Sequence, residues 1–302
     1  MTSAARSTGA VLSIGRIYCD LIFTGLQSMP VLGREIFADD MAIVAGGGAF
    51  IVAAYSASTG RPTALLSRLG TDTLSVGLMD QLGAGGVDLQ FLEHAADAGP
   101  QLTVAIIQNL ERAFLSRRAG SARPATLETA LAWQQASHLH IAEYATLLEI
   151  PRLVAQAKAH GLSVSLDPSW DETLIFDPAF LKNCAGVDLF LPNEEEATAI
   201  TGISDPEQSL RKLAESFPVV AVKAGAKGAY LAMNGQVYSS PAPNVAVVDT
   251  TGAGDAFDAG LINAWLDKSD AQSCLEAGVA LGSLAVQAAG GAAALKRVKN
   301  AG

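Results

Sequence analysis

A glycine-rich segment at residues 249–257 carries the residues best suited to chemistry. It reads D-T-T-G-A-G-D-A-F and opens an apolar stretch that continues to Trp265. Because residues 252–254 are small, their backbone N–H groups can converge at a helix N-terminus, which favours an anion such as a transferring phosphoryl group. Asp255 follows directly, and a carboxylate beside such an anion site can take the proton of an attacking hydroxyl. The segment therefore predicts phosphoryl transfer with Asp255 as general base; the structural alternative is an ordinary glycine-rich turn followed by an acidic first helical turn.

Further motifs precede this segment in a fixed order. They are Gly46-Gly47-Gly48 before a small-residue stretch that ends at Gly60, Gly70-Thr71-Asp72, L-P-N-E-E-E at 191–196, and V-K-A-G-A-K-G at 222–228. Together with residues 249–257, these motifs resemble the signatures of the ribokinase-like (PfkB) carbohydrate kinase family, and the resemblance extends over nearly the whole chain. One departure is Ser75, which stands where the family usually has a glycine.

The resemblance implies a role for each matching residue. The catalytic residues would be Asp255 as base with Gly252, Ala253 and Gly254 as the anion hole. The cofactor-binding residues for ATP and Mg²⁺ would be Asn193, Glu196, Lys223, Gly225 and Gly228. The metal-site residues would be Glu196 for Mg²⁺ and Asp249 and Thr251 beside a monovalent cation such as K⁺. The substrate-binding residues would be Asp20, Gly46, Gly47 and Asp255, with Ile51 at a position where relatives bind a sugar hydroxyl.

Several of these residues also have a structural interpretation. Residues 194–196 form an acidic first helical turn, which is favourable to the helix dipole without any metal. Asp20 could be a solvated loop acid, and Lys223 a strand-end surface lysine. Glu143 follows a predicted strand and is one more candidate for substrate contact. His138 and His140 share one strand face, but with no third ligand nearby they indicate core histidines rather than a metal site.

Alternation of strand-length apolar runs with helical stretches predicts an α/β fold with a mostly parallel sheet. Strands are expected at 11–17, 63–67, 138–141, 162–166, 189–191, 219–222 and 228–233. Helices are expected at 49–58, 74–82, 126–136, 146–159, 194–201, 206–217, 254–266 and 271–288. The Asn234-Gly235 pair predicts a hairpin that adds an antiparallel edge to the sheet. With the resemblance, this pattern predicts a ribokinase-like three-layer αβα sandwich.

Two segments interrupt the alternation and predict a small β lid. They are residues 20–44 and 103–118, and the second has the pattern of a hairpin turning at 109–112. The remaining segments, 1–19, 45–102 and 119–302, would form the nucleotide- and substrate-binding core. The resemblance also implies a homodimer that pairs through the lid.

Composition restricts the class of protein and its partners. Half of the 302 residues are hydrophobic and 17% are charged, as in compact globular proteins. The net charge of −10 opposes nucleic acid and anionic membranes as partners, so a small-molecule substrate is expected. Residues 277–295 lack charge, but their Ala and Gly content indicates a buried helix rather than a membrane span. Three widely spaced cysteines and the absence of a signal-like N-terminal stretch favour a cytoplasmic protein.

The resulting prediction is an ATP-dependent kinase that phosphorylates a hydroxyl of a sugar or sugar-like compound. A nucleoside kinase of the same fold is the nearest alternative, with Phe23, Phe37, Phe50 and Phe114 as candidates for a base-binding surface. A non-catalytic sugar or nucleotide sensor is another, but it would have no use for the base and anion hole. A dinucleotide-binding fold would need a glycine at Ile51, and no G-K-[S/T] sequence indicates a P-loop.

Ile51 is the main departure from the family pattern. An Asn usually stands here and bonds a sugar hydroxyl, whereas isoleucine has no polar side-chain atom. The identity of the substrate is therefore open.

Overall fold

The computed structural model describes residues 9–108, 111–288, 290–292 and 295. The central sheet has eight strands in the order β14-β13-β12-β11-β10-β9-β1-β4. Their bounds are β1 Ala10–Ile14, β4 Thr63–Leu66, β9 Ala136–Ile141, β10 Ser163–Leu166, β11 Leu189–Phe190, β12 Val219–Lys223, β13 Ala229–Met233 and β14 Gln236–Ser240. All neighbours from β12 to β4 are parallel, whereas β13 is antiparallel to both of its neighbours. The antiparallel edge predicted from Asn234-Gly235 is confirmed, and both residues adopt the positive φ that such a turn requires.

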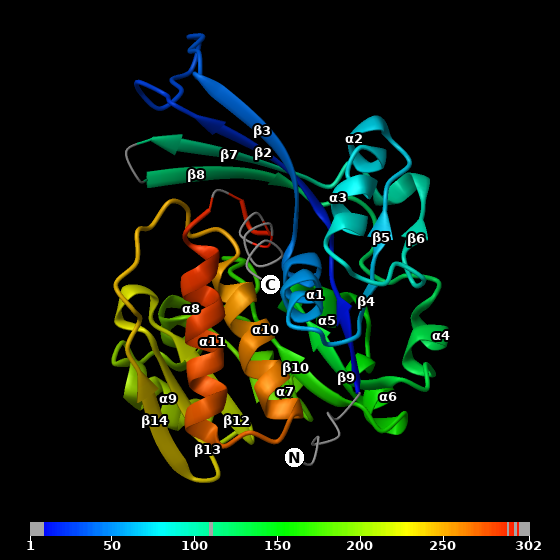
Figure 1. Ribbon diagram of the computed structural model, residues 1–302, viewed down its shortest axis with the longest axis vertical. Coiled ribbons are helices and arrows are strands. Elements are labelled where there is room, and N and C mark those ends of the chain that lie inside the picture. Colours follow the sequence, from blue (N-terminus) through cyan, green and yellow to red (C-terminus); the bar gives the residue numbers. More distant parts are fainter. Residues whose placement is uncertain (1–8, 109–110, 289, 293–294, 296–302) are drawn as a thin grey trace, which may run out of the picture.

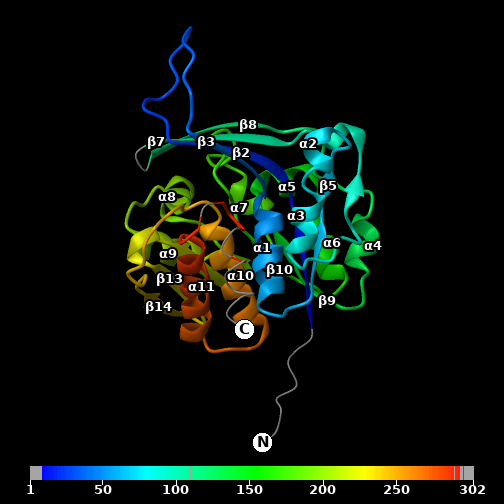
Figure 2. The same cartoon turned by 45° about the horizontal axis from the view of Figure 1, so that its top comes forward.

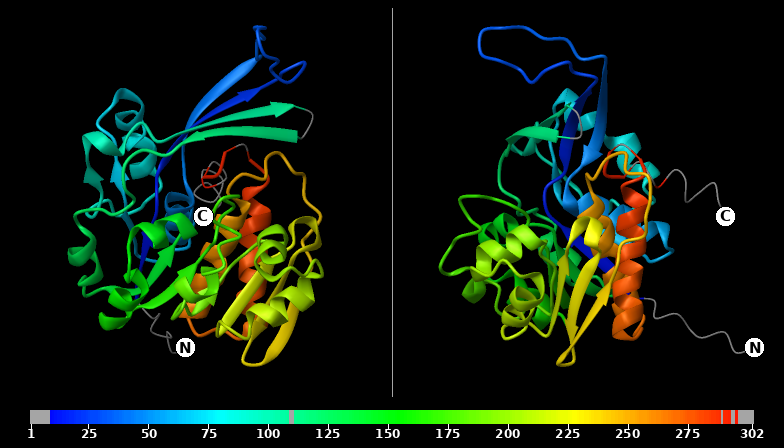
Figure 3. Two further views of the ribbon diagram at one scale, coloured as in Figure 1. Left: turned by 180° about the vertical axis from the view of Figure 1, so that it is seen from behind. Right: turned by 90° about the vertical axis from the view of Figure 1, so that its left-hand side faces the viewer.

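Helices cover both faces of this sheet (Figures 1 and 3). One face packs against α1 (Gly48–Ser58), α10 (Ala253–Leu266) and α11 (Ala271–Ala285). The other packs against α4 (Leu127–Leu131), α5 (Tyr144–Glu149), α6 (Leu153–Ala159), α7 (Phe180–Asn183), α8 (Glu194–Thr201) and α9 (Pro206–Leu213). Two short helices, α2 (Thr73–Val76) and α3 (Met79–Ala84), lie beside the first face, next to the small sheet of β5 (Arg68–Leu69) and β6 (Glu93–His94). The predicted αβα sandwich is confirmed.

A separate four-stranded sheet lies across the end of the sandwich where the parallel strands have their carboxyl ends (Figure 2). Its order is β3-β2-β7-β8, with β2 Tyr18–Thr24, β3 Asp40–Gly46, β7 Leu102–Gln108 and β8 Glu111–Arg117. These strands come from the two segments in which a lid was expected. Positions 109 and 110 of the expected hairpin turn lie outside the described residues, but the register of β7 and β8 is antiparallel.

Two long helices predicted from the sequence are each broken. The stretch expected to be helical over 146–159 becomes α5 and α6, because Pro151 has no backbone N–H and disfavours a helical residue before it. Arg152 then adopts a positive φ of 68°. The stretch expected over 74–82 is divided between α2 and α3, with Gly77 and Leu78 between them. The periodicity of apolar residues did not reveal either break, because tertiary packing can override the helical preference of a segment.

Within residues 277–295, α11 ends at Ala285. In the described part of the chain, no helix is long and apolar enough to cross a membrane. The close packing expected of its glycines is visible at Gly278, where an added Cβ would lie 2.8 Å from the Phe257 ring of α10.

Candidate active site

Two cavities meet at the N-terminus of α10, below the lid. The first has a volume of about 630 Å³ and the second about 480 Å³. Thr251, Gly252 and Asp255 line the first cavity, whereas Ala253 and Gly254 line the second. The loop that enters α10 is therefore the wall between the cavities, and we call them the Asp255 cavity and the Gly254 cavity. This is the edge of a parallel sheet at which open α/β folds bind their ligands.

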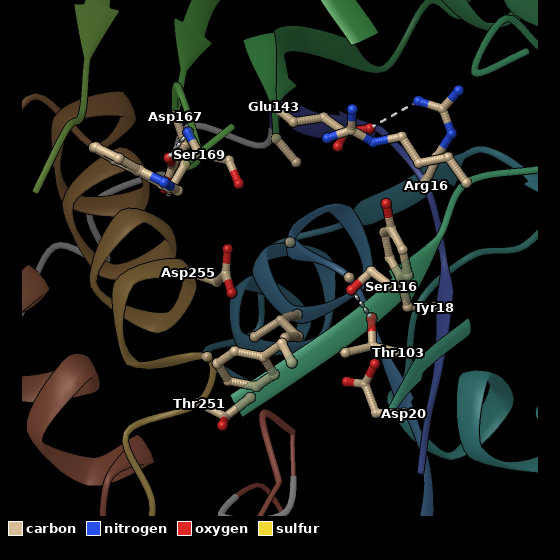
Figure 4. A pocket seen from close by; sticks show the side chains of 18 residues that line it. Arg16, Tyr18, Asp20, Thr103, Ser116, Glu143, Asp167, Ser169, Thr251 and Asp255 are labelled. Atoms are coloured by element: carbon tan, nitrogen blue, oxygen red, sulfur yellow. Dashed lines mark hydrogen bonds and ion pairs between the residues drawn. The ribbon is translucent and has the colours of Figure 1, made fainter. Parts of the chain in front are cut away.

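Asp255 lines the Asp255 cavity from the side of α10, across from Tyr18 and Asp20 (Figure 4). Burial, followed by repulsion from Asp167, raises the pKa of Asp255 to about 7, although Lys223 opposes the change. A carboxylate with a pKa near neutrality can both accept a proton and release it, which suits general-base work. Gly48 lies against this carboxylate, because a Cβ at Gly48 would be 2.7 Å from Oδ1 of Asp255.

The residues predicted to bind substrate converge on this cavity from several elements. Asp20 of β2 and Ile51 of α1 line it with Gly47. Gly46 lies behind Asp20, since a Cβ at that position would collide with the Asp20 carboxylate. Burial, together with repulsion from Asp255 and Asp249, raises the pKa of Asp20 to about 7, so Asp20 is not a solvated loop acid.

Glu143 also borders the Asp255 cavity, but its carboxylate is already engaged. Arg16 Nη1 donates to Glu143 Oε1 at 3.2 Å, and Thr146 Oγ1 donates to the same oxygen at 2.8 Å. Arg16 is also paired with Glu149 at 2.6 Å and bonds the Gly120 carbonyl at the end of the second lid segment. This network holds Glu143 in place and limits its freedom to bind a substrate.

Other residues complete the cavity, and sequence reasoning did not single them out as substrate contacts. They are Tyr18, Thr103, Ser116, Ser169 and Trp170, and Arg118 lines the cavity with them. Thr103 and Ser116 face each other across β7 and β8 with their hydroxyl oxygens 3.0 Å apart (Figure 4). These lid residues could have been found from the alternation of side chains along a strand, because every second side chain of a lid strand must face the core.

The aromatic residues proposed for a nucleobase do not gather here. Of the four, Phe114 lines the Asp255 cavity, whereas Phe50 is 2% exposed in the core and Phe37 is 78% exposed. That expected base-binding surface is therefore wrong as a set, because Phe50 is packed in the hydrophobic core and Phe37 is exposed to solvent.

The Gly254 cavity has a mostly apolar lining, which suits the base of a nucleotide. Apolar residues of α10, α11 and the loop before residue 249 form most of it, with Gly225 and Gly228 at its border. Both glycines have positive φ, and a Cβ at Gly228 would collide with the backbone of residues 240–242. That close approach lies within the protein, between Gly228 and the segment that follows β14, and it fixes the turn at the border of the cavity. The residues present fit ATP.

Asn193 and Glu196 form a capping box at the start of α8. Asn193 Oδ1 accepts from the Glu196 N–H, and Glu196 Oε2 accepts from the Asn193 N–H, both at 2.8 Å. Burial, followed by repulsion from Asp167, raises the pKa of Glu196 to about 8. Asn193 and Glu196 therefore cap α8, as the structural interpretation expected. Glu196 is also buried, and the charge of Asp255 contributes to raising its pKa. In the described residues, no three His, Cys, Asp or Glu side chains are placed to hold a metal directly. An arrangement that acts through the waters of Mg²⁺ fits these residues.

Asp249 connects the loop before α10 with the segment around Gly290 through hydrogen bonds. Its Oδ1 accepts from the N–H and hydroxyl of Thr251, at 2.9 and 2.8 Å, and its Oδ2 accepts from the Gly290 N–H at 2.9 Å. Gly252, with a φ of 74°, lies close to Gly291. A Cβ added to Gly252 would be only 2.6 Å from the Gly291 Cα. Asp249 thus joins the loop before α10 to the segment that contains Gly290. Binding of a monovalent cation beside Asp249 and Thr251 stays a prediction.

Lys223 is not the surface lysine that its strand-end position allowed. Its Nζ lies 2.7 Å from Asp167 Oδ2 and 3.2 Å from Asp258 Oδ1, and the Lys223 side chain is 11% exposed. Asp258 was missed by sequence reasoning, although an acid three residues after Asp255 in an apolar helix was a usable signal. Asp167 directly follows β10 and Lys223 ends β12, so their meeting at the carboxyl ends of the parallel strands could also have been expected.

The chain is similar in sequence to known carbohydrate kinases. A family model described as "pfkB family carbohydrate kinase" matches residues 10–297. A fructokinase from Klebsiella pneumoniae is 32% identical over 234 residues, which cover 72% of this chain and 75% of that protein.

Solved structures share the fold. Ribokinase from Arabidopsis thaliana, solved with ribose and ATP, superposes with a TM-score of 0.81 at 24% identity and covers 97% of this chain and 98% of that chain. A protein described as ribokinase II from Escherichia coli, solved with ATP and Mg²⁺, has a TM-score of 0.78 at 22% identity and covers 97% of this chain and 98% of that chain. With a family model spanning nearly the whole chain and a glycine-rich loop of the family's pattern between two cavities, the protein belongs to the PfkB family of carbohydrate kinases.

Proposed function

We propose that the protein transfers the γ-phosphoryl group of ATP to a hydroxyl of a sugar or sugar-like small molecule bound in the Asp255 cavity. One observation carries this proposal: the loop of Gly252, Ala253 and Gly254 separates a polar cavity that contains Asp255 from an apolar cavity that fits a nucleotide. The substrate would occupy the first cavity and ATP the second.

The reaction is an in-line displacement. Asp255 accepts the proton of the attacking hydroxyl as the new O–P bond forms and the bond from the γ-phosphorus to the bridging oxygen of ADP breaks. The N–H groups at the start of α10 stabilise the negative charge on the phosphoryl oxygens. Asp255 then holds the proton until product leaves.

The proposed reaction would also use two metal ions, Mg²⁺ and a monovalent cation. Mg²⁺ would neutralise phosphate charge, with Asn193 and Glu196 binding its waters. A cation such as K⁺ would bind near Asp249 and Thr251 and order the loop before α10. We further place the protein in the cytoplasm, with three cysteines that are free and buried in the structure.

A panel of neutral sugars, sugar acids, sugar phosphates and nucleosides, each with ATP and Mg²⁺, tests the proposal by release of ADP and by mass of the product. Substrate-dependent ADP release is the expected result. Preference for a nucleoside would favour the alternative kinase, for which Phe114 and Trp170 supply aromatic surface in the cavity. Binding without turnover throughout the panel would favour a sensor.

Ile51 is expected to exclude ordinary sugars such as ribose and fructose. Its side chain lines the Asp255 cavity and packs beside Gly291, and it offers no hydrogen bond to a hydroxyl. An unpaired buried hydroxyl costs about 1–3 kcal/mol. Ile51→Asn is therefore expected to raise kcat/KM for ribose or fructose by about tenfold, the equivalent of about 1.4 kcal/mol. Steady-state kinetics on both proteins measure the change.

The native substrate provides the control for Ile51→Asn, since its kcat/KM should fall or stay constant while that of the ordinary sugars rises. Efficient use of ribose or fructose by the unaltered protein, with kcat/KM near 10⁴ M⁻¹s⁻¹ or above on the usual enzyme scale of about 10⁴–10⁸, would show that Ile51 does not decide specificity.

The lid is proposed to pair with that of a second subunit. Its exposed face carries large apolar side chains: Met41 and Ile43 of β3 and Leu115 of β8 are 46%, 43% and 73% exposed. A dimer would bury this surface and protect the strand edges. Sedimentation velocity is expected to show a dimer, which Ile43→Lys should weaken; a monomer at all concentrations would exclude the pairing without affecting the proposed chemistry.

A further inference from the structure

Three charged side chains from separate elements meet below the loop that divides the cavities. Lys223 ends β12, Asp167 follows β10, and Asp258 lies on α10 one turn after Asp255. Lys223 Nζ is 2.7 Å from Asp167 and 3.2 Å from Asp258, and the Asp258 side chain is completely buried. We call these residues the Lys223 cluster.

The Lys223 cluster lies between the two cavities. Lys223 lines the Gly254 cavity and Asp167 lines the Asp255 cavity. A Cβ at Gly254 would be 3.4 Å from Lys223 Nζ, so the ammonium lies beside the N–H groups of the anion hole. The ammonium is therefore close to the position at which a phosphoryl group would bind the start of α10.

The charges of the cluster keep the lysine protonated. Burial by itself would lower the pKa of Lys223, but Asp167 and Asp258 outweigh it and raise that pKa. Burial also raises the pKa of Asp258, although the Lys223 ammonium opposes the change. A buried ion pair of this kind adds little net stability compared with apolar packing, which points to a use other than folding.

Resting on the proposed function, we infer that Lys223 is a catalytic residue that contacts the transferring phosphoryl group, and that Asp258 is a positioning residue that holds its ammonium at the anion hole. Lys223 Nζ would donate hydrogen bonds to oxygens of the phosphoryl group as they gain charge, while Asp258 keeps the side chain extended toward Gly254. No bond to Lys223 forms or breaks. This assigns Lys223 a part in the transition state, beyond binding the nucleotide.

Lys223→Met tests the inference, with Lys158→Met as the matched control. Lys158 of α6 pairs with Asp188, which directly precedes β11 and so lies at the amino end of the parallel strands, and neither residue lines either cavity. Loss of one electrostatic donor to a transition state typically lowers kcat by about 10²–10³. We expect that loss for Lys223→Met with little change in the KM of ATP, and wild-type kcat for Lys158→Met.

A transition-state analogue separates catalysis from structural support. ADP with aluminium fluoride and the best substrate of the panel should raise the Tm of the wild type well above the Tm with ADP and substrate alone. Lys223→Met should lose this additional shift and keep the shift caused by ADP. Asp258→Asn should show a smaller loss of kcat, again without a matching rise in the KM of ATP.

Removal of the lysine leaves two buried acids without a cation and could prevent folding. Lys223→Met/Asp258→Asn removes one of these charges, and the same measurements then apply to the double variant. An unchanged kcat in either folded variant, or equal loss of the ADP and aluminium fluoride shifts, would overturn the inference and leave the proposed function intact. If the wild type phosphorylates no compound in the panel, the proposed function fails and the inference fails with it.

Discussion

Asp255→Asn is expected to lower kcat by about 10²–10⁴, the usual contribution of general-base catalysis, while the protein still folds and binds ATP. Asn is nearly isosteric with Asp but cannot accept a proton at neutral pH. Because the Asp255 carboxylate is buried and has a raised pKa, removal of its charge should not destabilise the fold. Steady-state kinetics with the best substrate of the panel, together with ATP binding by calorimetry, measure both effects.

The pH profile of the wild type provides the control for this assignment. Asp255 must be deprotonated to act as a base, and its pKa is raised to about 7. The kcat/KM is therefore expected to rise with pH through about 7 and then to level off, and Asp255→Asn should lose this dependence. Asp20 also has a pKa near 7, so Asp20→Asn is needed to show which carboxylate is responsible. Wild-type turnover in Asp255→Asn would refute the assignment of the base.

Gly48→Ala is expected to lower kcat by about 10², because a displacement of about 1 Å in a reacting group can cost that much. An added methyl group would lie 2.7 Å from Asp255 Oδ1 and 3.2 Å from the Ala142 Cβ. The Asp255 carboxyl group can rotate away, so the protein should fold, but the base would leave its position in the cavity. Steady-state kinetics and thermal unfolding measure the two effects.

Gly83→Ala is the matched control for Gly48→Ala. Gly83 lies in α3, and an added Cβ there has no atom within 4 Å. Since alanine favours a helix by about 1 kcal/mol over glycine, this variant should be as stable as the wild type or more stable, with unchanged kcat. If Gly48→Ala keeps its kcat, the contact with Asp255 has no catalytic importance.

Much of the architecture could be predicted because the signals are local and regular. Apolar runs of strand length between helical stretches predicted a parallel sheet, and the Asn234-Gly235 pair predicted its antiparallel edge. The segment that carries the proposed base could also be identified, since the glycines and Asp255 are adjacent in the sequence and their order reflects how one loop enters one helix. Helix breaks such as that at Pro151 were less certain, because the same proline can also begin a helix.

By itself the sequence determined the family, the αβα architecture and the loop that carries the proposed base, because each of these depends on neighbouring residues or on periodicity along one segment. Only the tertiary structure decided what lies around that loop. It brought Lys223, Asp167 and Asp258 together, engaged Glu143 with Arg16, tied Asp249 to Gly290, and separated Phe50 from Phe114. Distances between such residues depend on how strands and helices pack, and burial then changes their pKa values, so neither is encoded in local spacing.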